Sequence, residues 1–335
     1  MTETAFPEVE NPVITLVITC HQRKQYLKSA IDSAVHQSFP RTQYEILVVA
    51  DFNDAEIGEH CKVNNVEFIF DPRHGIGTKM AIGIERAAGE IICFLNDDDL
   101  FCENKLSTIF NYFRESPDTV YIHNNSLRIN ASGDIINNEP VSNQSQIYKI
   151  DDKVSTKWVM KSFRNYMMFN DSSISIRKSY YYRHISVLFD VYGNQDNILF
   201  YLGLLFKNNL IFIPNVLTYF RLNESGSSYL ENSNKMCELT TKRLLSFHRT
   251  LQYLNNLGIR GNVYNLVFSE LRTQYLINLI LLCNHGRNVQ EPFSMTSSFT
   301  GTYIWDFRRL ALYILFLLAK VFPSFSSKVL TRIYK

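Results

Sequence analysis

The stretch Gly89-Glu90-Ile91-Ile92-Cys93-Phe94-Leu95-Asn96-Asp97-Asp98-Asp99 joins five consecutive apolar residues to three consecutive carboxylates. An apolar run that does not alternate with polar residues is typical of a buried parallel strand. The aspartates then lie at the carboxyl end of the strand, where open α/β sheets bind ligands. Three adjacent carboxylates repel one another, which favours a hard divalent cation that holds a phosphorylated ligand. The alternative is a solvated acidic turn that caps the next helix, because aspartate is a good N-cap.

Further apolar runs predict the elements beside this strand. Residues 13–19 and 45–50 are rich in β-branched or aliphatic side chains, and residues 66–70 form a third short run. Residues 24–38 carry apolar side chains at helical spacing, and residues 76–88 form the helix before the central strand. Strand–helix–strand units are right-handed, so their loops open on one edge of the sheet. The expected fold is α/β, with a Rossmann-like, mixed but mainly parallel sheet flanked by helices.

After the central strand the pattern changes to helices and shorter strands. We expect helices at residues 103–115 and 198–206, and a half-exposed strand within residues 170–177 that follows an acidic loop. The other strands are expected at residues 119–123, 126–136 (as a hairpin), 210–214 and 216–222.

Glycines mark the segment before the central strand. Gly75, Gly77 and Gly83 fall in or beside the helix predicted there, although glycine lowers helix stability. This composition is expected where the backbone approaches a diphosphate or a neighbouring strand closely.

Residues 74–106 resemble the diagnostic segment of family 2 glycosyltransferases of the GT-A fold. In that family a glycine-rich helix leads to a Gly-Glu strand and then to an Asp-x-Asp-Asp metal motif. This chain departs from the pattern because the first motif aspartate is Asn96 and the usual Arg-Asn pair is Met80-Ala81, with Lys79 beside it as a substitute. The likeness extends over about residues 12 to 228. The positions that carry it are Gly75, Gly83, Ala88, Gly89, Glu90, Phe94, Leu95, Asp98, Asp99, Lys105 and Leu106.

The resemblance implies a nucleotide-diphospho-sugar donor and a divalent cation, Mg²⁺ or Mn²⁺. Asp98 is the favoured metal ligand because the residues around it fix the alignment, and Asp99 and Asn223 complete the expected metal set. A second register, in which Asp97 and Asp99 bind the ion, stays open. The residues expected to bind the nucleotide sugar are Thr19, His21, Arg23, Asp51, Lys79, Asn96, Asp97 and Arg221.

Three of the implied site residues also have an ordinary structural interpretation. Asp51 matches the family's nucleobase-reading aspartate, although the Gly-Ser that usually follows is absent, and it is otherwise a plain loop residue. Arg221 matches an arginine whose loop folds over the diphosphate, and is otherwise a surface ion-pair residue. Asp196 matches the family's catalytic base, although its neighbours are Gln195 and Asn197 in place of Glu and Trp; the alternative is a helix N-cap.

The combined prediction is an inverting, non-processive and metal-dependent transferase. It would move a sugar from a nucleotide-diphosphate donor, with a UDP-sugar favoured, to a glycan or lipid-linked glycan, and Asp196 would be the general base. A single in-line displacement inverts the anomeric carbon. Two alternatives are a catalytically silent nucleotide-sugar-binding paralogue and a sugar nucleotidyltransferase. The second normally has a glycine-rich loop after its first strand, and residues 20–24 contain no glycine.

Composition limits the other possibilities. The chain has 335 residues, of which 46% are hydrophobic and 20% charged, which is enough for one large core or two domains. A net charge of +2 is too small to indicate nucleic-acid binding. The six cysteines show no C-x-x-C spacing, so we expect neither a zinc site nor a disulfide framework, and the compartment is expected to be the reducing cytosol. Residues 1–12 do not resemble a signal peptide.

The chain is expected to divide into three parts. Residues 1–230 form the GT-A domain, with a donor half at about 12–125 and an acceptor half at about 126–230. Residues 231–300 form a helical extension, with helices at 234–257 and 263–283. Residues 301–335 form an amphipathic segment.

The last segment predicts contact with a membrane surface. Residues 310–319 are uncharged and lie between basic residues, and ten residues are too few to span a bilayer. A short apolar helix with aromatic and basic flanks is typical of an interfacial anchor, so residues 303–335 are expected to contact the cytoplasmic face of the cell membrane. The alternative is a helix that closes the core or a dimer interface.

Overall fold

The computed structural model describes residues 11–21, 23–142, 144–150, 168–189, 191–205, 209–222 and 233–284. Backbone contacts divide the chain into two compact units, Met1–Gly226 and Ser227–Lys335. The first unit contains the nine-stranded sheet, and the described part of the second consists of two helices.

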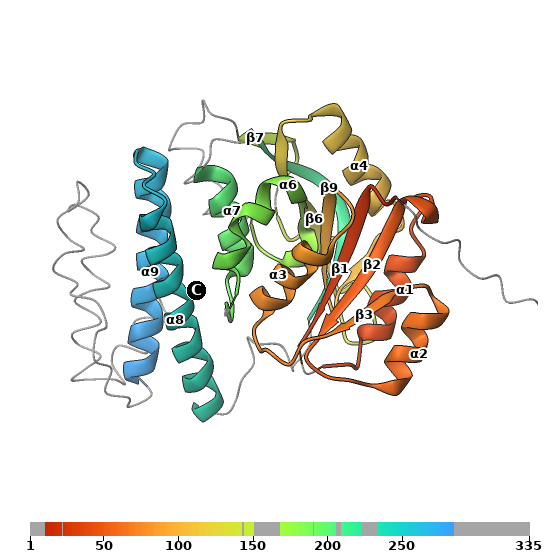
Figure 1. The fold of residues 1–335 in the computed structure, drawn as a ribbon, viewed down its shortest axis with the longest axis horizontal. Coiled ribbons are helices and arrows are strands. Elements are labelled where there is room, and N and C mark those ends of the chain that lie inside the picture. Colours follow the sequence, from red (N-terminus) through yellow and green to blue (C-terminus); the bar gives the residue numbers. More distant parts are fainter. Residues whose placement is uncertain are drawn as a thin grey trace, which may run out of the picture. The chain divides into compact units, whose positions relative to one another are not determined.

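Four parallel strands form one half of the sheet (Figure 1). They are β1 (Ile14–Cys20), β2 (Tyr44–Ala50), β3 (Glu67–Phe70) and β4 (Ile91–Asn96), and they lie side by side in the order β3-β2-β1-β4. β1 pairs with β2 from Ile14–Tyr44 to Cys20–Ala50. The residues of β1 are all buried, as expected for a strand covered on both faces. The four apolar runs recognised in the sequence are therefore the parallel strands.

Helices cover both faces of these strands. α1 (Leu27–Val35), α2 (Ala55–Val63) and α4 (Lys105–Glu115) contribute to one hydrophobic cluster with alternate residues of β1, β2 and β4. α3 (Ile76–Arg86) contacts β1 and β2 from the opposite side, so the strands lie between two helical layers (Figure 1).

The glycines of the α3 region allow close packing of protein against protein. A Cβ on Gly83 would lie 2.3 Å from Cγ1 of Val17 in β1, and a Cβ on Gly77 would lie 2.4 Å from the carbonyl oxygen of Leu188. Gly89 approaches the backbone of β1, where a Cβ would lie 2.6 Å from the carbonyl carbon of Ile14. These glycines were expected to allow close approach of the backbone either to a diphosphate or to a neighbouring strand. The structure shows close approach to neighbouring elements of the protein.

The other half of the sheet is mixed. β8 (Ile174–Arg177) runs antiparallel between β4 and β6 (Thr119–Ile129), and β6 is parallel to β9 (Asn209–Arg221). β5 (Leu100–Phe101) and β7 (Tyr148–Ile150) pair antiparallel with β9. Shorter elements complete the unit: η1 (Arg41–Gln43), η2 (Asp171–Ser173), α6 (Lys178–Tyr181), η3 (Tyr182–Val187) and α7 (Gln195–Leu205).

Two pairs of predicted strands are single strands in the structure. Residues 119–123 and 126–136 were predicted as separate strands, but β6 runs without a break from Thr119 to Ile129. The two buried asparagines in its middle are hydrogen-bonded, so they do not interrupt it: Asn124 donates to Thr218, and Asn125 donates to the carbonyl of Ser142. Residues 210–214 and 216–222 likewise form one strand, β9, with a register shift in its pairing to β6.

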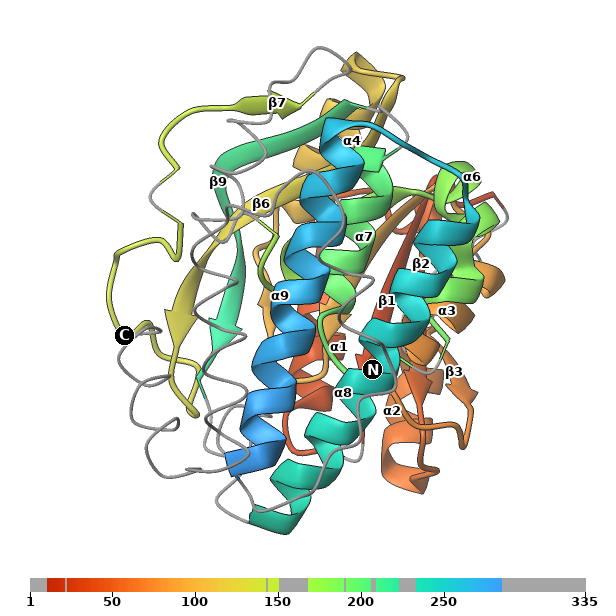
Figure 2. The ribbon, with the colours of Figure 1, turned by 90° about the vertical axis from the view of Figure 1, so that its left-hand side faces the viewer.

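The described part of the second unit is a helix pair (Figure 2). α8 (Ser233–Asn256) and α9 (Asn262–Asn284) contact each other, and their ends lie within one residue of the predicted helices. Among the residues described, no helix is long and apolar enough to cross a membrane. The segment 303–335, predicted to contact a membrane surface, lies outside the described residues.

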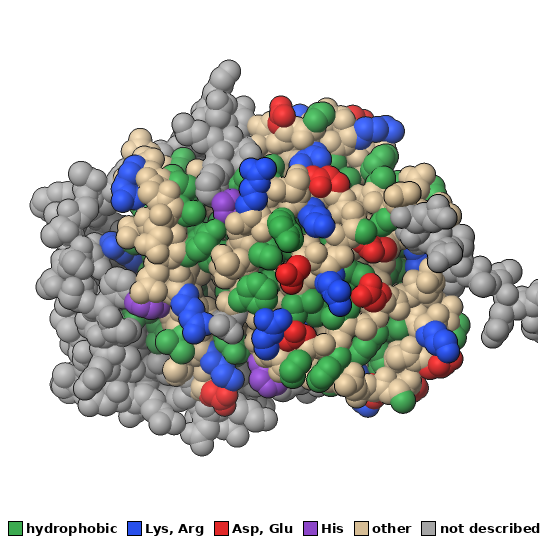
Figure 3. All heavy atoms as spheres, viewed as in Figure 1, with side chains coloured by type: hydrophobic (Ala, Val, Ile, Leu, Met, Phe, Trp, Pro, Cys, Tyr) green, Lys and Arg blue, Asp and Glu red, His purple; other side chains and the backbone are tan. Residues whose placement is uncertain are grey.

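Charges of both signs are mixed over the described surface drawn in Figure 3. Lysine and arginine side chains lie next to aspartates and glutamates on this face. Ion pairs among the described residues include Lys24–Asp54, Lys28–Glu56 and Arg73–Asp71. This face therefore carries no extended basic area.

Candidate active site at the carboxyl edge of the sheet

The parallel strands bring three predicted segments to one edge. β1 ends beside β4, where Thr19 is the register partner of Asn96 and its hydroxyl lies 3.4 Å from the Asn96 Oδ1. β1 also ends beside β2, where Cys20 pairs with Ala50, the residue before Asp51. The loops after β1, β2 and β4 therefore open together, as the βαβ topology predicts.

Arg23 connects the loop after β1 to the acidic motif. Its guanidinium donates to Asp97 Oδ1 at 2.6 Å and lies 2.9 Å from Asp98 Oδ2. Asp97 also accepts a hydrogen bond from the Cys20 thiol at 3.2 Å. Burial raises the pKa of Asp97 to about 7, although the charge of Arg23 opposes this shift. Asp98 is the more accessible carboxylate, with 14% of its side chain exposed against 4% for Asp97.

Asp99 turns away from solvent into a buried hydrogen-bond network. It accepts from the Ser172 hydroxyl at 2.6 Å and from the Arg221 backbone N–H at 2.9 Å. Burial and the neighbouring charge of Asp98 raise the pKa of Asp99 to about 7. The side chains of Asp97 and Asp99 thus point to different partners, and Asp98 lies between them in sequence.

Arg221 is buried and fixes the loop that carries the motif. Its Nε donates to the Asp98 carbonyl at 2.7 Å, and Nη1 donates to the carbonyls of Asn130 and Ala131, both at 2.9 Å. The guanidinium also lies 4.4 Å from the ring centroid of Tyr26, which is a cation–π contact. The alternative interpretation as an exposed ion-pair residue is therefore wrong. The described hydrogen bonds of the Arg221 guanidinium are with protein carbonyls.

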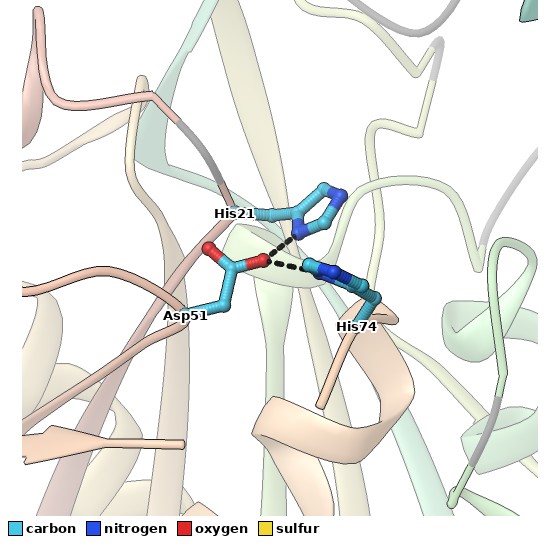
Figure 4. A group of neighbouring side chains, drawn as sticks. All are labelled: His21, Asp51 and His74. Carbon is cyan, nitrogen blue, oxygen red and sulfur yellow. Dashed lines mark hydrogen bonds and ion pairs between the residues drawn. The ribbon is translucent and has the colours of Figure 1, made fainter. Parts of the chain in front are cut away.

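The loop after β2 places Asp51 between two histidines (Figure 4). Nδ1 of His21 hydrogen-bonds to Asp51 Oδ2, and Nδ1 of His74 lies 3.0 Å from the same oxygen. The ammonium of Lys79, a fully buried side chain, is 3.9 Å from it. Basic groups from three segments therefore surround one carboxylate whose own side chain is fully buried.

Asp196 lies in the first turn of α7 and is held by backbone amides. Its carboxylate accepts from the N–H of Asn197 at 2.8 Å and from the backbone N–H of Asn170. Burial raises its pKa to about 6, and these hydrogen bonds oppose the shift. α7 begins at Gln195, so Asp196 is the second residue of the helix and not its N-cap. Its carboxylate nevertheless accepts from a first-turn amide and is poised to change its protonation near neutral pH.

Asp171 is a second buried carboxylate beside Asp196. Gln195 donates to its Oδ2, whereas its Oδ1 has no hydrogen-bond partner among the described residues. Burial, followed by the charge of Asp196, raises the pKa of Asp171 well above its usual value. Asp171 therefore binds a proton more readily than an exposed aspartate does.

The short segment from Asn170 to Ser173 joins the two acidic regions. The backbone N–H of Asn170 donates a hydrogen bond to Asp196, and the hydroxyl of Ser172 donates one to Asp99. The Ser172 carbonyl accepts from the ammonium of the fully buried Lys105 at 3.0 Å and from Thr218 Oγ1 at 2.9 Å, which fixes the segment against the sheet. The metal-motif aspartates and the candidate base are thus brought to one site by one buried segment.

The donor set of the acidic motif fits a hard cation. Carboxylate oxygens are the ligands of Mg²⁺ and Mn²⁺, and Mg²⁺ is commonly held by one or two carboxylates together with the phosphates of a substrate. Asp98 supplies the accessible carboxylate, and burial is the main cause of the raised pKa values of Asp97 and Asp99 on either side of it. Among the residues that the structure describes, the side chains of the acidic motif do not converge on one point, so the phosphates would complete the coordination.

Comparison with protein families matches residues 15–177 to the model described as glycosyl transferase family 2. Residues 15–177 form a family 2 glycosyltransferase domain. The matched glycosyltransferases include an uncharacterized glycosyltransferase of Rickettsia bellii, 25% identical over 124 residues, which are 36% of this chain and 18% of the relative. Another, from Rickettsia felis, is 26% identical over 127 residues, which are 37% of this chain and 21% of the relative. The chain spans about a fifth of the length of these two relatives.

The glycosyltransferase domain has the GT-A fold. The crystal structure of S. aureus TarS 1–349 in complex with UDP matches with a TM-score of 0.50 and 13% identity, over 93% of this chain and 80% of that chain. The TarS 1–349 complex with UDP-GlcNAc matches with a TM-score of 0.51 and 14% identity, over 81% of each chain. At this level of identity the likeness concerns the fold alone.

Most residues predicted for the glycosyltransferase site gather at this edge. Asn223 lies outside the described residues. The residues found around the loops after β1, β2 and β4, or linked to them, are Thr19, His21, Arg23, Asp51, Lys79, Asn96, Asp97, Asp98, Asp99 and Arg221.

The sequence analysis of the glycosyltransferase domain missed several polar partners. His74 directly precedes Gly75 in the diagnostic segment, and Asp171 belongs to the acidic loop noted before β8, so both had a local signal. Ser172 and Cys20 had none, because their roles depend on contacts with residues more than 70 positions away: Asp99 and Asp97.

Proposed function

We propose that this chain is an inverting, non-processive glycosyltransferase. It moves a sugar from a nucleotide-diphosphate donor, with a UDP-sugar favoured, to a hydroxyl of a glycan or lipid-linked glycan. The observation that carries the proposal is the segment Asn170–Ser173, which contacts the metal-motif residue Asp99 and the candidate base Asp196 at once. The family match and the fold shared with TarS, whose crystal structures contain UDP and UDP-GlcNAc, support it.

Asp196 is the proposed general base. With a pKa of about 6 it is mostly deprotonated at pH 7.5 and still basic enough to take a proton from an attacking hydroxyl. The amides of Asn170 and Asn197 hold the carboxylate in place, so no side-chain rotation is needed before proton transfer. The acceptor oxygen then attacks the anomeric carbon from the face opposite the diphosphate, which inverts its configuration.

The donor is proposed to bind along the loops after β1, β2 and β4. Asp51 accepts from the imide N–H of the nucleobase, and Arg23, Lys79 and Arg221 contribute positive charge near the phosphates. A Mg²⁺ or Mn²⁺ ion bound through Asp98, with Asp99 and Asn223 as the other proposed ligands, would neutralise the leaving diphosphate. Arg23 positions Asp98 for this role, because its guanidinium contacts both Asp97 and Asp98.

The organisation of the whole chain is part of the proposal. Residues 1–230 carry donor and acceptor halves, residues 231–300 extend the domain, and residues 301–335 associate with the cytoplasmic face of the cell membrane. A lipid-linked acceptor would meet the enzyme there, which fits a role in polysaccharide biosynthesis.

A ligand screen tests this function. Melting temperatures of the full chain are measured with a panel of nucleotide sugars, with and without Mn²⁺, and hits are assayed for donor hydrolysis and transfer. We expect a UDP-sugar to raise the melting temperature, more strongly with Mn²⁺, since a ligand of the native state stabilises by mass action. If no nucleotide sugar binds, the proposal fails; binding without turnover would instead indicate the silent paralogue.

A further inference from the structure

Three potential metal ligands converge outside the acidic motif. His21 follows β1, Asp51 follows β2 and His74 precedes α3, and one ligand atom from each lies within 4.8 Å of the others. Figure 4 shows both imidazoles turned toward the carboxylate. Two imidazoles and one carboxylate form a donor set that imidazole-preferring transition metals use in proteins.

The cluster combines a fixed carboxylate with accessible imidazoles. The Asp51 side chain is fully buried, whereas 41% of the His21 side chain and 51% of the His74 side chain are exposed. An ion can therefore reach the cluster from solvent.

Lys79 determines which ions the cluster accepts. Its ammonium is 3.9 Å from Asp51 Oδ2 and repels any cation bound there, although it donates to the Arg73 carbonyl at 2.6 Å. The binding of a hard ion such as Mg²⁺ depends mainly on the negative charge of its oxygen ligands. The positive charge of Lys79 offsets the negative charge of the one carboxylate in this cluster. An ion that also bonds strongly to imidazole nitrogen loses less affinity from the charge of Lys79 than Mg²⁺ does. This favours Zn²⁺ and similar transition-metal ions.

We propose that His21, Asp51 and His74 form a second cation site, selective for Zn²⁺-like ions and separate from the Mg²⁺ or Mn²⁺ site at the acidic motif. An ion in this site occupies the Asp51 oxygen. Because the proposed function uses Asp51 to bind the nucleobase, Zn²⁺ then competes with the donor; this consequence rests on the proposed function, whereas the site itself does not.

Direct metal binding tests the site. Zn²⁺ is titrated into the metal-free full chain by calorimetry, and Co²⁺ is used as a spectroscopic substitute whose visible absorption reports nitrogen ligation. His74→Ala removes one ligand from a half-exposed position, and we expect the affinity for Zn²⁺ to fall about 100-fold or more, since even outer partners of metal ligands are worth 10- to 100-fold. His21→Gln is the second ligand variant and should weaken binding similarly.

Two matched variants make the result specific. His36 is an exposed histidine on the turn after α1, and His36→Ala should leave Zn²⁺ affinity unchanged. Asp98→Ala alters the acidic motif and should also leave it unchanged. The site is refuted if His74→Ala binds Zn²⁺ as tightly as the natural chain, or if Asp98→Ala abolishes binding while His74→Ala does not.

The competition is tested separately by titrating UDP in the presence of Mn²⁺, with and without one equivalent of Zn²⁺. We expect Zn²⁺ to weaken UDP binding at least tenfold in the natural chain and to have no effect in His74→Ala. Equal UDP affinity with and without bound Zn²⁺ would overturn the competition. If UDP does not bind at all, the proposed function fails, while the calorimetric test of the metal site keeps its meaning.

Discussion

Asp51 and Asp97 lie on the proposed donor side of the candidate site, and Asp171 and Asp196 lie on the proposed acceptor side. The two pairs are buried among different groups. Basic side chains surround the donor pair: His21, His74 and Lys79 contact Asp51, and Arg23 contacts Asp97. The described hydrogen bonds to the acceptor pair come from amides: the Gln195 side chain and the backbone N–H groups of Asn170 and Asn197.

This difference separates two ways of accommodating buried negative charge. Basic partners preserve a carboxylate as a charge, which suits a surface where phosphates and cations exchange. Amides are neutral partners, and their hydrogen bonds oppose the rise that burial causes in the pKa of Asp196. Burial raises the pKa on both sides, to about 7 for Asp97 and to about 6 for Asp196. The two sides therefore differ in their partners, which are basic side chains on the donor side and neutral amides on the acceptor side.

The largest effect is expected from Asp196→Asn. The amide occupies nearly the same space but cannot accept the proton of the acceptor hydroxyl, so the transfer rate should fall by about 10²- to 10⁴-fold. In the natural enzyme the rate should fall as the pH drops below about 6, because Asp196 becomes protonated there and loses its function as a base. Initial rates of transfer between pH 5 and 8 measure both effects.

Glu59→Gln is the control for this change, because Glu59 is an exposed carboxylate on α2. Its rate and pH profile should match those of the natural chain. Undiminished transfer by Asp196→Asn would remove Asp196 from the mechanism.

Asp98→Asn tests the proposed metal site. The substitution removes the accessible carboxylate of the motif, and we expect a loss of about 100-fold in Mn²⁺-dependent turnover, in line with several kcal/mol of charge stabilisation by a metal. Chelation of divalent ions with EDTA should reduce the natural enzyme to a similar level.

Asp97→Asn distinguishes the two registers of the motif. It should retain more activity than Asp98→Asn, since Asp97 is nearly buried against Arg23 and Cys20. Full activity in Asp98→Asn together with its loss in Asp97→Asn would establish the other register.

An intermediate effect, on stability, is expected from a substitution in the packing between α3 and β1. Gly83→Ala places a Cβ 2.3 Å from Val17 in β1, so we expect the free energy of unfolding to fall by about 1–3 kcal/mol. Urea denaturation measures the change. Gly58→Ala in α2 is the matched control, because nothing lies within 4 Å of its added Cβ, and it should stabilise the chain by about 0.4–1 kcal/mol.

The smallest effect is expected from Asp171→Asn. The raised pKa of Asp171 favours its neutral form, so we expect a neutral amide of similar shape to replace it with little change, and Gln195 can donate to the new carbonyl. The transfer rate at pH 7.5 should change less than about threefold. A loss as large as that of Asp196→Asn would show that Asp171 acts as a charged group and would erase the contrast between the two sides.

The parallel half of the sheet was predictable because burial on both faces leaves a continuous apolar run in the sequence. β1, β2 and β4 each have such a run, and the loops that follow them had to meet at one edge. β6 and β9 were predicted as broken strands because asparagines and a proline interrupt their patterns. Their continuity depends on hydrogen bonds such as that from Asn124 to Thr218, 94 residues along the chain.

The candidate site was also predictable only in part. Asp51, Asp98 and Asp196 each follow or begin a recognisable element, so the sequence indicated their positions. Sequence spacing contains no information on the pairing of Ser172 with Asp99 or of Gln195 with Asp171, since these partners are 73 and 24 residues apart and meet only in the folded chain.

Asn170 has a φ of 77°, a left-handed conformation that asparagine tolerates better than most residues, and it begins the segment shared by both acidic regions. That segment limits where sequence blocks can be exchanged between this enzyme and its relatives to make a working chimaera. A chimaera that exchanges the acceptor half at the start of β8 would leave residues 170–173 with one parent and Asp196 with another. Crossovers that keep both within one parental block should yield working hybrids far more often.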